Sequence, residues 1–476
     1  MADTPAPDVA SRLASELAEA FPADLLRTQD ADRARYETDH RRRYHGRALG
    51  VALPRTTDDV SRLLAWCNAR GVGVVPQGGN TSYCGGATPD ASGTQLVLSL
   101  ERMRSVRELD VANASLTVEA GCLLAEVQAA AAGAGCYFPL ELGSAGSCQI
   151  GGNLATNAGG LNVLRYGMTR ALVLGIEAVL ADGRVYERLR ALRKDNTGYD
   201  LCSLLVGSEG TLGVITAATL RLWPARRSTA TAFVALPSPA AALALLQLLR
   251  ARCDERLESF ELLPRIALEL VRRHVPGTAS PFAEAPPWSV LCELASPGLE
   301  PLGDLLQSVL ADALAAGIAT DAVLATGESQ RLALWAVREN VPEAQKRGGP
   351  GLRHDISVPV ASIPRFIEEA GARLAQLAPT ATLVGYGHLG DGNLHFNLNW
   401  FAGAAPGEVE AAELPVRRYV HDLVAAYGGS FSAEHGVGQS KRGELQRYGS
   451  PVGLATMRAL KQAFDPNGIM NPGKVL

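Results

Sequence analysis

The stretch PQGGNTSYCGG, Pro76 to Gly86, is unusually rich in glycine and small polar residues. Glycine turns of this kind can cradle a pyrophosphate through backbone N–H groups, because no Cβ keeps the anion away. The stretch follows VGVVP, which is typical of a buried strand, and TTDDVSRLLAWCNARG, which predicts a helix with Thr57 before an acidic first turn. It matches neither GxGxxG nor the Walker A pattern, so a phosphate loop and a plain surface turn are both open.

A second block of small residues runs from Glu141 to Thr169 and reads ELGSAGSCQIGGNLATNAGGLNVLRYGMT. Single apolar residues interrupt it, which distinguishes it from a disordered linker. The segment LVLGIEAVLADGRV then predicts two strands joined by a hairpin turn at Asp182 and Gly183.

The overall composition limits the classes of function. A chain of 476 residues is expected to form two or more domains. It has 45 Lys and Arg against 49 Asp and Glu, so it lacks the excess positive charge that binding to nucleic acid requires. No apolar window has the length of a membrane span, and the N-terminus lacks a signal pattern, so we expect a soluble cytoplasmic protein. The basic run RYETDHRRRYHGR, with His40 and His45, predicts a solvated surface segment.

The eight cysteines are scattered, with no CxxC pair and no cluster suited to zinc or an iron–sulfur centre. We expect reduced thiols, most of them buried, at Cys67, Cys84, Cys122, Cys136, Cys148, Cys202, Cys253 and Cys292.

The second half of the chain has a different pattern of helix- and strand-forming residues. From about Arg226, ALPSPAAALALLQLLRARC and Leu/Ala-rich helices around 263–273 and 299–317 alternate with short apolar strands such as WSVLCEL. The Pro-rich PGTASPFAEAPP predicts a surface loop. The pattern indicates a second α+β domain.

Two of the eight histidines, His388 and His395, lie in the short segment GYGHLGDGNLHFNL, residues 385–398. Residues of equal parity share a face of a strand, so His395, Asn397 and Asn399 point one way while the intervening apolar residues pack the other way. A turn at Gly390-Asp391-Gly392 can bring the two imidazoles together.

The segment FSAEHGVG offers Glu434 as a third ligand, with His435 beside it. Two imidazoles and a carboxylate suit Zn²⁺ or another divalent ion acting as a Lewis acid. The alternative interpretation is a pair of hydrogen-bonded core histidines and a surface acid.

Five motifs in order, Pro76–Thr81, Ile150–Asn153, Ala155–Gly160, Arg165–Gly167 and Gly207–Gly213, resemble the FAD-binding domain of the vanillyl-alcohol oxidase type. The resemblance implies an α+β fold with a two-lobed FAD-binding domain, an α+β substrate or cap domain, and a C-terminal segment that completes the active site. It implies FAD contacts at Pro76, Gly78, Gly79, Asn80, Thr81, Ser82, Gly85, Leu142, Gly143, Gly146, Ser147, Ile150, Gly151, Gly152, Ala155, Thr156, Asn157, Gly159, Gly210, Gly213, Ile215 and Asn471.

The corresponding domain limits are 1–45 for an N-terminal helical segment, 46–225 for the FAD-binding domain, 226–430 for the substrate domain and 431–476 for the C-terminal segment. Members of the family often tether the flavin through a histidine near the first loop, but no histidine lies between His45 and His274. The resemblance therefore implies non-covalent FAD, with a cysteine link left open, although Cys84 and Cys148 are more typical of small packing residues.

Residues 48–476 further resemble the flavin-dependent D-2-hydroxy-acid dehydrogenases, notably the D-2-hydroxyglutarate and D-lactate dehydrogenase group. The closing segment FDPNGIMNPGKVL is part of that resemblance. It implies a divalent metal, Zn²⁺ with Mn²⁺ or Co²⁺ as alternatives, held by His388, His395 and Glu434. It also implies that His435 is the base and that Arg338 binds the substrate carboxylate.

Two positions depart from the family pattern. Pro342 stands where threonine is common, so one hydrogen-bond donor is absent. Arg353 stands where lysine is common, so a planar guanidinium takes the place of a compact ammonium group. We expect Arg338, Arg353 and Asn397 to hold the substrate.

The implied reaction oxidises a D-2-hydroxy acid, D-2-hydroxyglutarate favoured, with hydride transfer to FAD. Electrons would pass to a separate acceptor such as electron-transfer flavoprotein, a quinone or a cytochrome, and a homodimer is left open. The alternatives are a D-lactate dehydrogenase or glycolate-oxidase-like enzyme, an oxidase, a metallohydrolase, and a non-catalytic FAD-binding subunit.

Overall fold

The computed structural model describes residues 7–476, which form two compact units. Unit 1 consists of residues up to Gly160 together with Gly167–Ala225 and Glu434–Leu476, and unit 2 of Leu161–Tyr166 and Arg226–Ala433. The chain thus enters unit 2 next to the predicted limit at 225. The predicted domain limits differ from this division at the N-terminal segment, which belongs to unit 1, and at Leu161–Tyr166.

The first sheet of unit 1 contains a βαβ arrangement, as the sequence predicts. Its strand order is β1-β2-β4-β3, with β2 and β3 parallel to β4. Its strands are β1 (Leu26–Arg27), β2 (Ala48–Ala52), β3 (Val74–Gln77) and β4 (Gln95–Ser99), and its helices are α1 (Pro7–Ala20), α2 (Asp30–Arg33) and α3 (Thr57–Arg70).

The cap of α3 is Thr56, one residue earlier than the predicted Thr57. The Thr56 hydroxyl accepts the Asp59 N–H at 3.1 Å, and the Asp59 carboxylate accepts the Thr56 N–H at 3.2 Å. This reciprocal pair satisfies two backbone donors of the first turn, which fixes where the helix begins.

The second sheet of unit 1 is antiparallel, with order β5-β6-β10-β8-β9. The predicted hairpin at Asp182 and Gly183 is confirmed, because it joins β8 to β9. The remaining strands and helices of unit 1 are β5 (Val106–Asp110), β6 (Ser115–Glu119), β7 (Cys136–Tyr137), β8 (Val173–Val179), β9 (Val185–Arg188), β10 (Val214–Arg221), β11 (Trp223–Pro224), α4 (Leu124–Gly133), α5 (Ile150–Ala155), α7 (Leu201–Leu205), α15 (Arg442–Tyr448) and α16 (Pro451–Phe464).

The C-terminal segment returns to the first sheet. The Val74 N–H donates to the Ile469 carbonyl at 2.7 Å, and the Asn471 N–H donates to the Val74 carbonyl at 2.8 Å. Ile469 and Met470 are buried in the same core as the strand residues Leu96 and Leu98. Residues near position 470 are therefore fixed beside the strand that leads into the first glycine loop.

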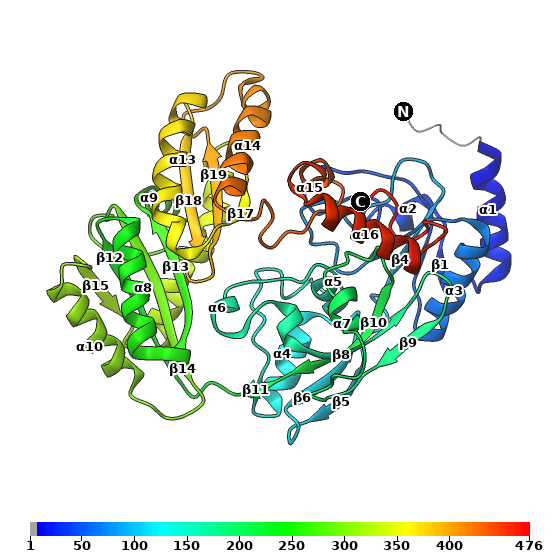
Figure 1. Ribbon diagram of the computed structural model, residues 1–476, viewed down its shortest axis with the longest axis horizontal. Coiled ribbons are helices and arrows are strands. Elements are labelled where there is room, and N and C mark those ends of the chain that lie inside the picture. The colour runs from blue at the N-terminus through cyan, green and yellow to red at the C-terminus, as the bar shows by residue number, and fades with distance from the viewer. Residues whose placement is uncertain (1–6) are drawn as a thin grey trace. The chain divides into compact units, whose positions relative to one another are not determined.

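Unit 2 is built on one antiparallel sheet with order β15-β12-β14-β13-β18-β19-β16, in which β17 also pairs with β19 (Figure 1). Its strands are β12 (Ser228–Leu236), β13 (Leu257–Pro264), β14 (Trp288–Ser296), β15 (Asp321–Leu324), β16 (Gly351–Leu352), β17 (Asp355–Ser357), β18 (Thr382–His388) and β19 (Asn393–Asn399). Its helices are α6 (Val163–Tyr166), α8 (Pro239–Cys253), α9 (Arg265–His274), α10 (Leu302–Ala315), α11 (Glu328–Glu339), α12 (Val341–Gly348), α13 (Ile363–Leu377) and α14 (Glu408–Ala426).

The two faces of this sheet differ. Helices α8, α10, α13 and α14 pack on one face, where Leu394, Phe396 and Leu398 are buried. Helices α9, α11 and α12 pack against part of the other face, around Val384 and Tyr386. The alternation predicted for β19 is confirmed, because its apolar residues lie in the first core and its polar residues belong to the second face.

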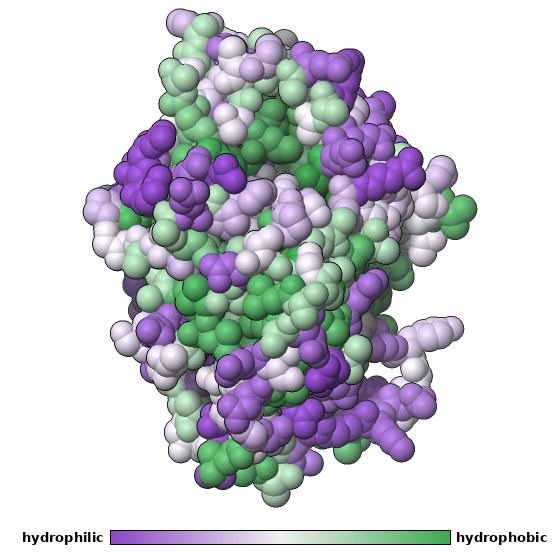
Figure 2. Space-filling model, turned by 90° about the vertical axis from the view of Figure 1, so that its left-hand side faces the viewer, coloured by the Kyte–Doolittle hydropathy of each residue, from purple (hydrophilic) through white to green (hydrophobic). Residues whose placement is uncertain are grey.

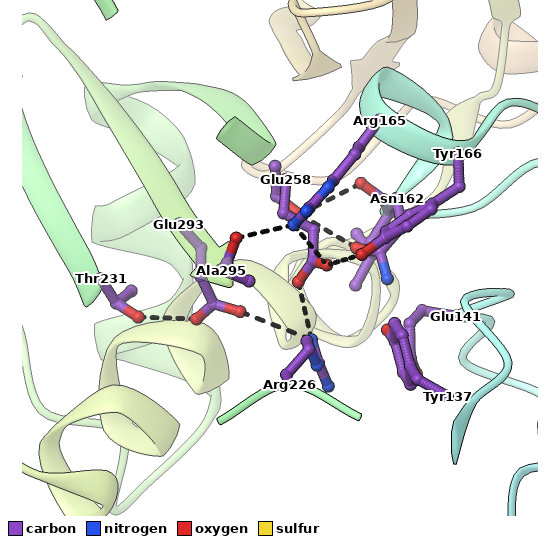
Figure 3. A network of polar contacts seen from close by, with 12 residues as sticks. Tyr137, Glu141, Asn162, Arg165, Tyr166, Arg226, Thr231, Glu258, Glu293 and Ala295 are labelled. Atoms are coloured by element: carbon purple, nitrogen blue, oxygen red, sulfur yellow. Dashed lines mark hydrogen bonds and ion pairs between the residues drawn. The ribbon is translucent and has the colours of Figure 1, made fainter. Parts of the chain in front are cut away.

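Segment Leu161–Tyr166 belongs to unit 2 because it is anchored on a buried carboxylate. Glu258 is wholly buried and accepts hydrogen bonds from the Tyr166 hydroxyl at 2.8 Å and from Arg226 at 2.7 Å (Figure 3). Arg165 lies 3.7 Å from the same carboxylate. Burial and the Glu258 charge raise the pKa of Tyr166, so the phenol remains the donor. The sequence prediction assigned this segment to the first domain, because its partner Glu258 lies 92 residues beyond Tyr166 in the chain.

Figure 2 faces the side of unit 2 that carries α10 and β15 and shows apolar and hydrophilic areas interleaved over it. The edge strand β15 has only 4 residues and begins with the exposed Asp321, which discourages pairing with another strand.

All eight cysteines are free thiols and seven are buried, which confirms the prediction for them. Among the described residues, none of the helices combines the length and apolar character needed to cross a bilayer.

Candidate functional site

The first glycine loop packs backbone to backbone on the second block of small residues. A Cβ on Gly79 would lie 2.0 Å from the Ser147 carbonyl oxygen, and a Cβ on Gly78 would lie 3.3 Å from the Gly152 nitrogen. Only glycine permits this approach at position 79. The structure therefore brings together the two loops that the sequence assigned to FAD.

Three buried polar atoms on these segments have no hydrogen-bond partner: Gln149 Oε1, Asn153 Nδ2 and Asn471 Oδ1. Buried polar groups are normally paired, and an orphan marks a place where a polar ligand is needed. The cradle and the orphan atoms fit an extended dinucleotide such as FAD.

The fifth motif, Gly207–Gly213, contacts the same loop. A Cβ on Gly210 would lie 3.0 Å from the Pro76 ring, and Asn471 Nδ2 donates to the carbonyls of Gly86 and Glu209 at 2.9 and 2.8 Å. The other predicted FAD contacts lie on these loops, or on β10 for Ile215, and stay predictions.

Glu209 fixes the loop that carries His435. Its carboxylate accepts the N–H groups of Val437 and Gly438 at 2.7 and 2.8 Å, and the Gly160 N–H donates to Glu434 at 2.7 Å. Burial raises the pKa of Glu209 although both backbone N–H groups oppose the shift. Glu209 was not among the predicted site residues, although an acid inside a glycine motif was a signal for it.

His435 lies against the first glycine loop. Its ring packs edge-on against Tyr83, with 4.8 Å between ring centroids, and Gln439 Nε2 donates to the Gly85 carbonyl at 2.9 Å. His40 is also near, with its ring centroid 6.1 Å from that of Tyr83. The proposed base and the proposed pyrophosphate loop are thus parts of one packed structure within unit 1.

In unit 2, the β18–β19 hairpin brings His388 and His395 together, as the sequence predicts. Their ring centroids are 5.4 Å apart, and residues 389–392 form the turn between the strands. His388 is buried and His395 is half-buried beside Tyr386, at a centroid distance of 5.1 Å.

A carboxylate that the sequence did not predict links a histidine to an arginine. Glu261 of β13 is completely buried, and its two oxygens accept His388 Nδ1–H and Arg338 Nε–H, each at 2.6 Å. Burial alone would raise the pKa of Glu261, but His388 and Arg338 hold it well below its usual range. Since Nδ1 carries the hydrogen of this bond, Nε2 is the His388 nitrogen suited to coordinate a metal.

Two groups of residues offer atoms that could bind a metal ion: His388, His395 and Glu434, and Asp355, Glu434 and His435. Glu434 directly follows Ala433, whose N–H donates to the Asp355 carbonyl at 3.3 Å. Two imidazoles and a carboxylate are a donor set that fits Zn²⁺ and related divalent ions.

The remaining predicted substrate residues also lie in unit 2. Arg338 is buried on α11, and its guanidinium lies 4.9 Å over the Tyr386 ring. Arg353 is exposed and donates through Nη1 to Gln345 Oε1 at 2.9 Å and Asn399 Oδ1 at 2.6 Å. Asn397 is buried, and its Nδ2 donates to the same Gln345 oxygen at 3.0 Å.

Comparison with known proteins identifies the family. The FAD binding domain family matches residues 48–188, and the family of FAD linked oxidases, C-terminal domain, matches residues 225–475. The mitochondrial D-2-hydroxyglutarate dehydrogenase of Bos taurus is 42% identical over 445 residues, 92% of this chain and 78% of that protein. The chain belongs to the D-2-hydroxyglutarate dehydrogenase family of FAD-linked oxidoreductases. The D-2-hydroxyglutarate dehydrogenase of Xanthomonas citri pv. viticola is 38% identical over 464 residues, 96% of each chain.

Solved structures share the fold of this family member. p-Cresol methylhydroxylase with substrate bound superposes with a TM-score of 0.76 at 14% identity, over 98% of this chain and 97% of that one. Alkyldihydroxyacetonephosphate synthase gives 0.76 at 19% identity, over 97% and 84%. At these identities the likeness concerns the fold alone, and it confirms the predicted α+β architecture of the vanillyl-alcohol oxidase type.

Proposed function

We propose that this protein oxidises a D-2-hydroxy acid to the 2-oxo acid with non-covalently bound FAD, and that D-2-hydroxyglutarate is the favoured substrate. One observation carries the proposal: the buried carboxylate of Glu261 holds both His388 and Arg338 by hydrogen bonds. Glu261 thus fixes a metal ligand, His388, next to a residue that can bind a carboxylate, Arg338. This pair suits a substrate whose hydroxyl and carboxylate are on adjacent carbon atoms.

Each residue has a separate role in the proposed reaction. Arg338 pairs with the C1 carboxylate, and Asn397 orients it. His435 takes the hydroxyl proton as the general base. FAD, held by the glycine loops, would supply the acceptor for the hydride from C2. His388, His395 and Glu434 would hold a divalent ion, Zn²⁺ in the first place, which would supply Lewis-acid chemistry that makes the hydroxyl more acidic.

The side-chain preference depends on Arg353. Its exposed guanidinium supplies a positive charge for a second carboxylate, and its planar fork suits that group. Pro342 removes a donor and favours a monoacid such as D-lactate, which is the second candidate. A charge-assisted hydrogen bond outweighs one neutral contact, so we favour the diacid.

The proposal includes a cytoplasmic location and electron transfer to a separate acceptor, such as electron-transfer flavoprotein, a quinone or a cytochrome. The free thiols of the chain are the usual state in a reducing compartment.

Anaerobic reduction of the flavin tests the function. The purified yellow protein is mixed with D- and L-2-hydroxyglutarate, malate and lactate, and bleaching of the flavin band is followed. We expect bleaching by the D series only, fastest with D-2-hydroxyglutarate. Bound FAD that no hydroxy acid reduces would identify a non-catalytic subunit, and peroxide formation in air at the rate of turnover would identify an oxidase.

A further inference from the structure

The basic run of the sequence forms a closed loop in unit 1, residues 38–45. Asp39 is buried, and its carboxylate accepts the N–H groups of Tyr44 at 2.6 Å and of Arg41 at 3.1 Å. The Asp39 N–H donates in turn to the Tyr44 carbonyl at 3.1 Å. Local hydrogen bonds therefore fix the backbone of this loop, although its three arginine side chains are exposed.

The basic loop packs on the first glycine loop, which carries predicted FAD contacts. Asn80 Nδ2 donates to the Thr38 carbonyl at 2.8 Å. A Cβ on Gly85 would lie 2.7 Å from the Tyr44 ring, so glycine is needed where the two loops meet. These contacts lie before and after Tyr83 in the sequence, and they hold the basic loop against the segment that contains it.

Tyr83 contacts both the basic loop and the proposed base. The guanidinium carbon of Arg41 lies 3.7 Å from the centroid of the Tyr83 ring, which is the geometry of a cation–π contact. The Tyr83 ring meets His435 edge-on, with 4.8 Å between ring centroids and 82° between ring planes. One aromatic ring therefore connects Arg41 to His435, and all three residues belong to unit 1.

Packing in the core does not explain these two side chains. Tyr83 is 36% exposed and interrupts a loop of glycines and small polar residues, in which the backbone makes the close contacts. Arg41 is exposed, and with the residues that the structure describes its side chain forms neither an ion pair nor a hydrogen bond. The ring contacts of Tyr83 are therefore the interactions through which both side chains can act.

We propose that Tyr83 is a positioning residue that keeps the His435 ring in the orientation in which it takes the hydroxyl proton, and that Arg41 holds Tyr83 in place. A base must lie within hydrogen-bond reach of the proton that it removes, and a displacement of about 1 Å can lower a rate about 100-fold. A ring that is itself held by a cation restricts how far the imidazole beside it can tilt. The inference rests on the proposed function, in which His435 is the general base.

The test follows flavin reduction by D-2-hydroxyglutarate in anaerobic stopped-flow experiments with the FAD-loaded protein, which give a limiting rate and a substrate Kd. Y83L removes the ring, and we expect the limiting rate to fall about 30- to 100-fold while Kd changes less than about threefold. Y83F keeps the ring and should retain the wild-type rate within about threefold. Equal losses in Y83F and Y83L, or a loss that lies in Kd or in FAD content, would overturn the role of the ring.

R41M tests the contact between the guanidinium and the ring, with R43M as the matched control. Arg43 is exposed on the same loop and has the same charge, but it contacts no aromatic ring of the described residues. We expect R41M to lower the limiting rate about three- to tenfold, and R43M to leave it unchanged. Because Arg41 acts through Tyr83, R41M should add nothing to the loss in Y83L. Equal effects of R41M and R43M, or additive losses in the double variant, would refute the role of Arg41.

A spectroscopic measurement separates this inference from the proposed function. A wild type that no hydroxy acid reduces contradicts the function. The Hε1 resonance of His435 in NMR spectra of isotope-labelled histidine still reports the contact, because an aromatic ring displaces the signals of nearby hydrogens, and H435Q assigns it. At fixed pH, we expect Y83L and R41M to shift this resonance and R43M to leave it in place. An unchanged His435 resonance in Y83L would show that Tyr83 does not hold the ring.

Discussion

Replacing Glu261 by glutamine changes one atom at the centre of the unit 2 site. The two carboxylate oxygens accept hydrogen bonds from His388 and Arg338, each at 2.6 Å. The amide group of E261Q must face one of these two N–H donors, so one hydrogen bond is lost and the buried guanidinium loses its counter-charge. A hydrogen bond to a charged group contributes about 1.5–3 kcal/mol, and breaking a buried pair costs about 3–5 kcal/mol. We expect E261Q to lower the free energy of unfolding by about 3 kcal/mol.

The second consequence of E261Q concerns the metal. A carboxylate that accepts the second N–H of a coordinating histidine orients the ring and makes it more basic, and losing it typically weakens metal binding about 10- to 100-fold. The assay is competition between the metal-free protein and a chromophoric chelator for Zn²⁺, at fixed pH and with FAD retained. This readout does not depend on turnover.

Glu258 provides the matched control. It lies on the same strand, is wholly buried, and accepts hydrogen bonds from Tyr166 and Arg226, neither of which is a predicted metal ligand. E258Q should lose a similar amount of stability and keep wild-type metal affinity. If E261Q binds Zn²⁺ as tightly as wild type, or if both variants lose the same affinity, Glu261 has no specific role at the metal ligands and the reasoning is refuted.

Four further predictions follow from the site. Acid precipitation should release FAD into the supernatant, because we expect no covalent tether, and flavin that stays in the pellet would contradict this. Chelation should abolish turnover while FAD remains bound, and Zn²⁺, Mn²⁺ or Co²⁺ should restore it; full activity after verified metal removal would make the histidines structural. R353M should lower kcat/KM for D-2-hydroxyglutarate about 10- to 100-fold more than for D-lactate, and equal losses would assign Arg353 to the shared carboxylate or outside the pocket. The pKa of Glu261 is held below its ordinary value of 4.5. The stability advantage of wild type over E261Q should therefore be complete above pH 4.5 and shrink as the pH falls below it. Urea unfolding that shows a constant advantage down to about pH 3 would argue against the shift.

The features that sequence predicts here are those with a local physical cause. Alternation of period 2 placed His395 and Asn397 on one face of β19, and the Gly-Asp-Gly turn explained how His388 joins them. The glycine loops were recognised because close backbone contact at Gly79 tolerates no other residue. Each of these inferences needs only a few consecutive residues.

The residues that sequence did not predict act over long separations. Glu261 lies 127 residues from His388, and Gln345 lies 52 residues from Asn397. Neither has a periodic or motif signal, since an acid in an apolar strand and a glutamine on a short helix are ordinary until the fold supplies their partners. Arg165 and Tyr166 show the same limit, because their motif resembled the flavin domain while their contacts are with Glu258 of unit 2.

The two expected departures from the family pattern, Pro342 and Arg353, have opposite effects on the number of hydrogen-bond donors. Pro342 removes a donor, whereas a guanidinium has five N–H groups against the three of an ammonium. Arg353 gives two hydrogen bonds to Gln345 and Asn399, and a lysine held by the same oxygens would have one N–H left for a ligand. A guanidinium has two more N–H groups than an ammonium, in a fixed plane that matches a carboxylate. We therefore expect an arginine at position 353 to offset the donor lost at Pro342 better than a lysine would.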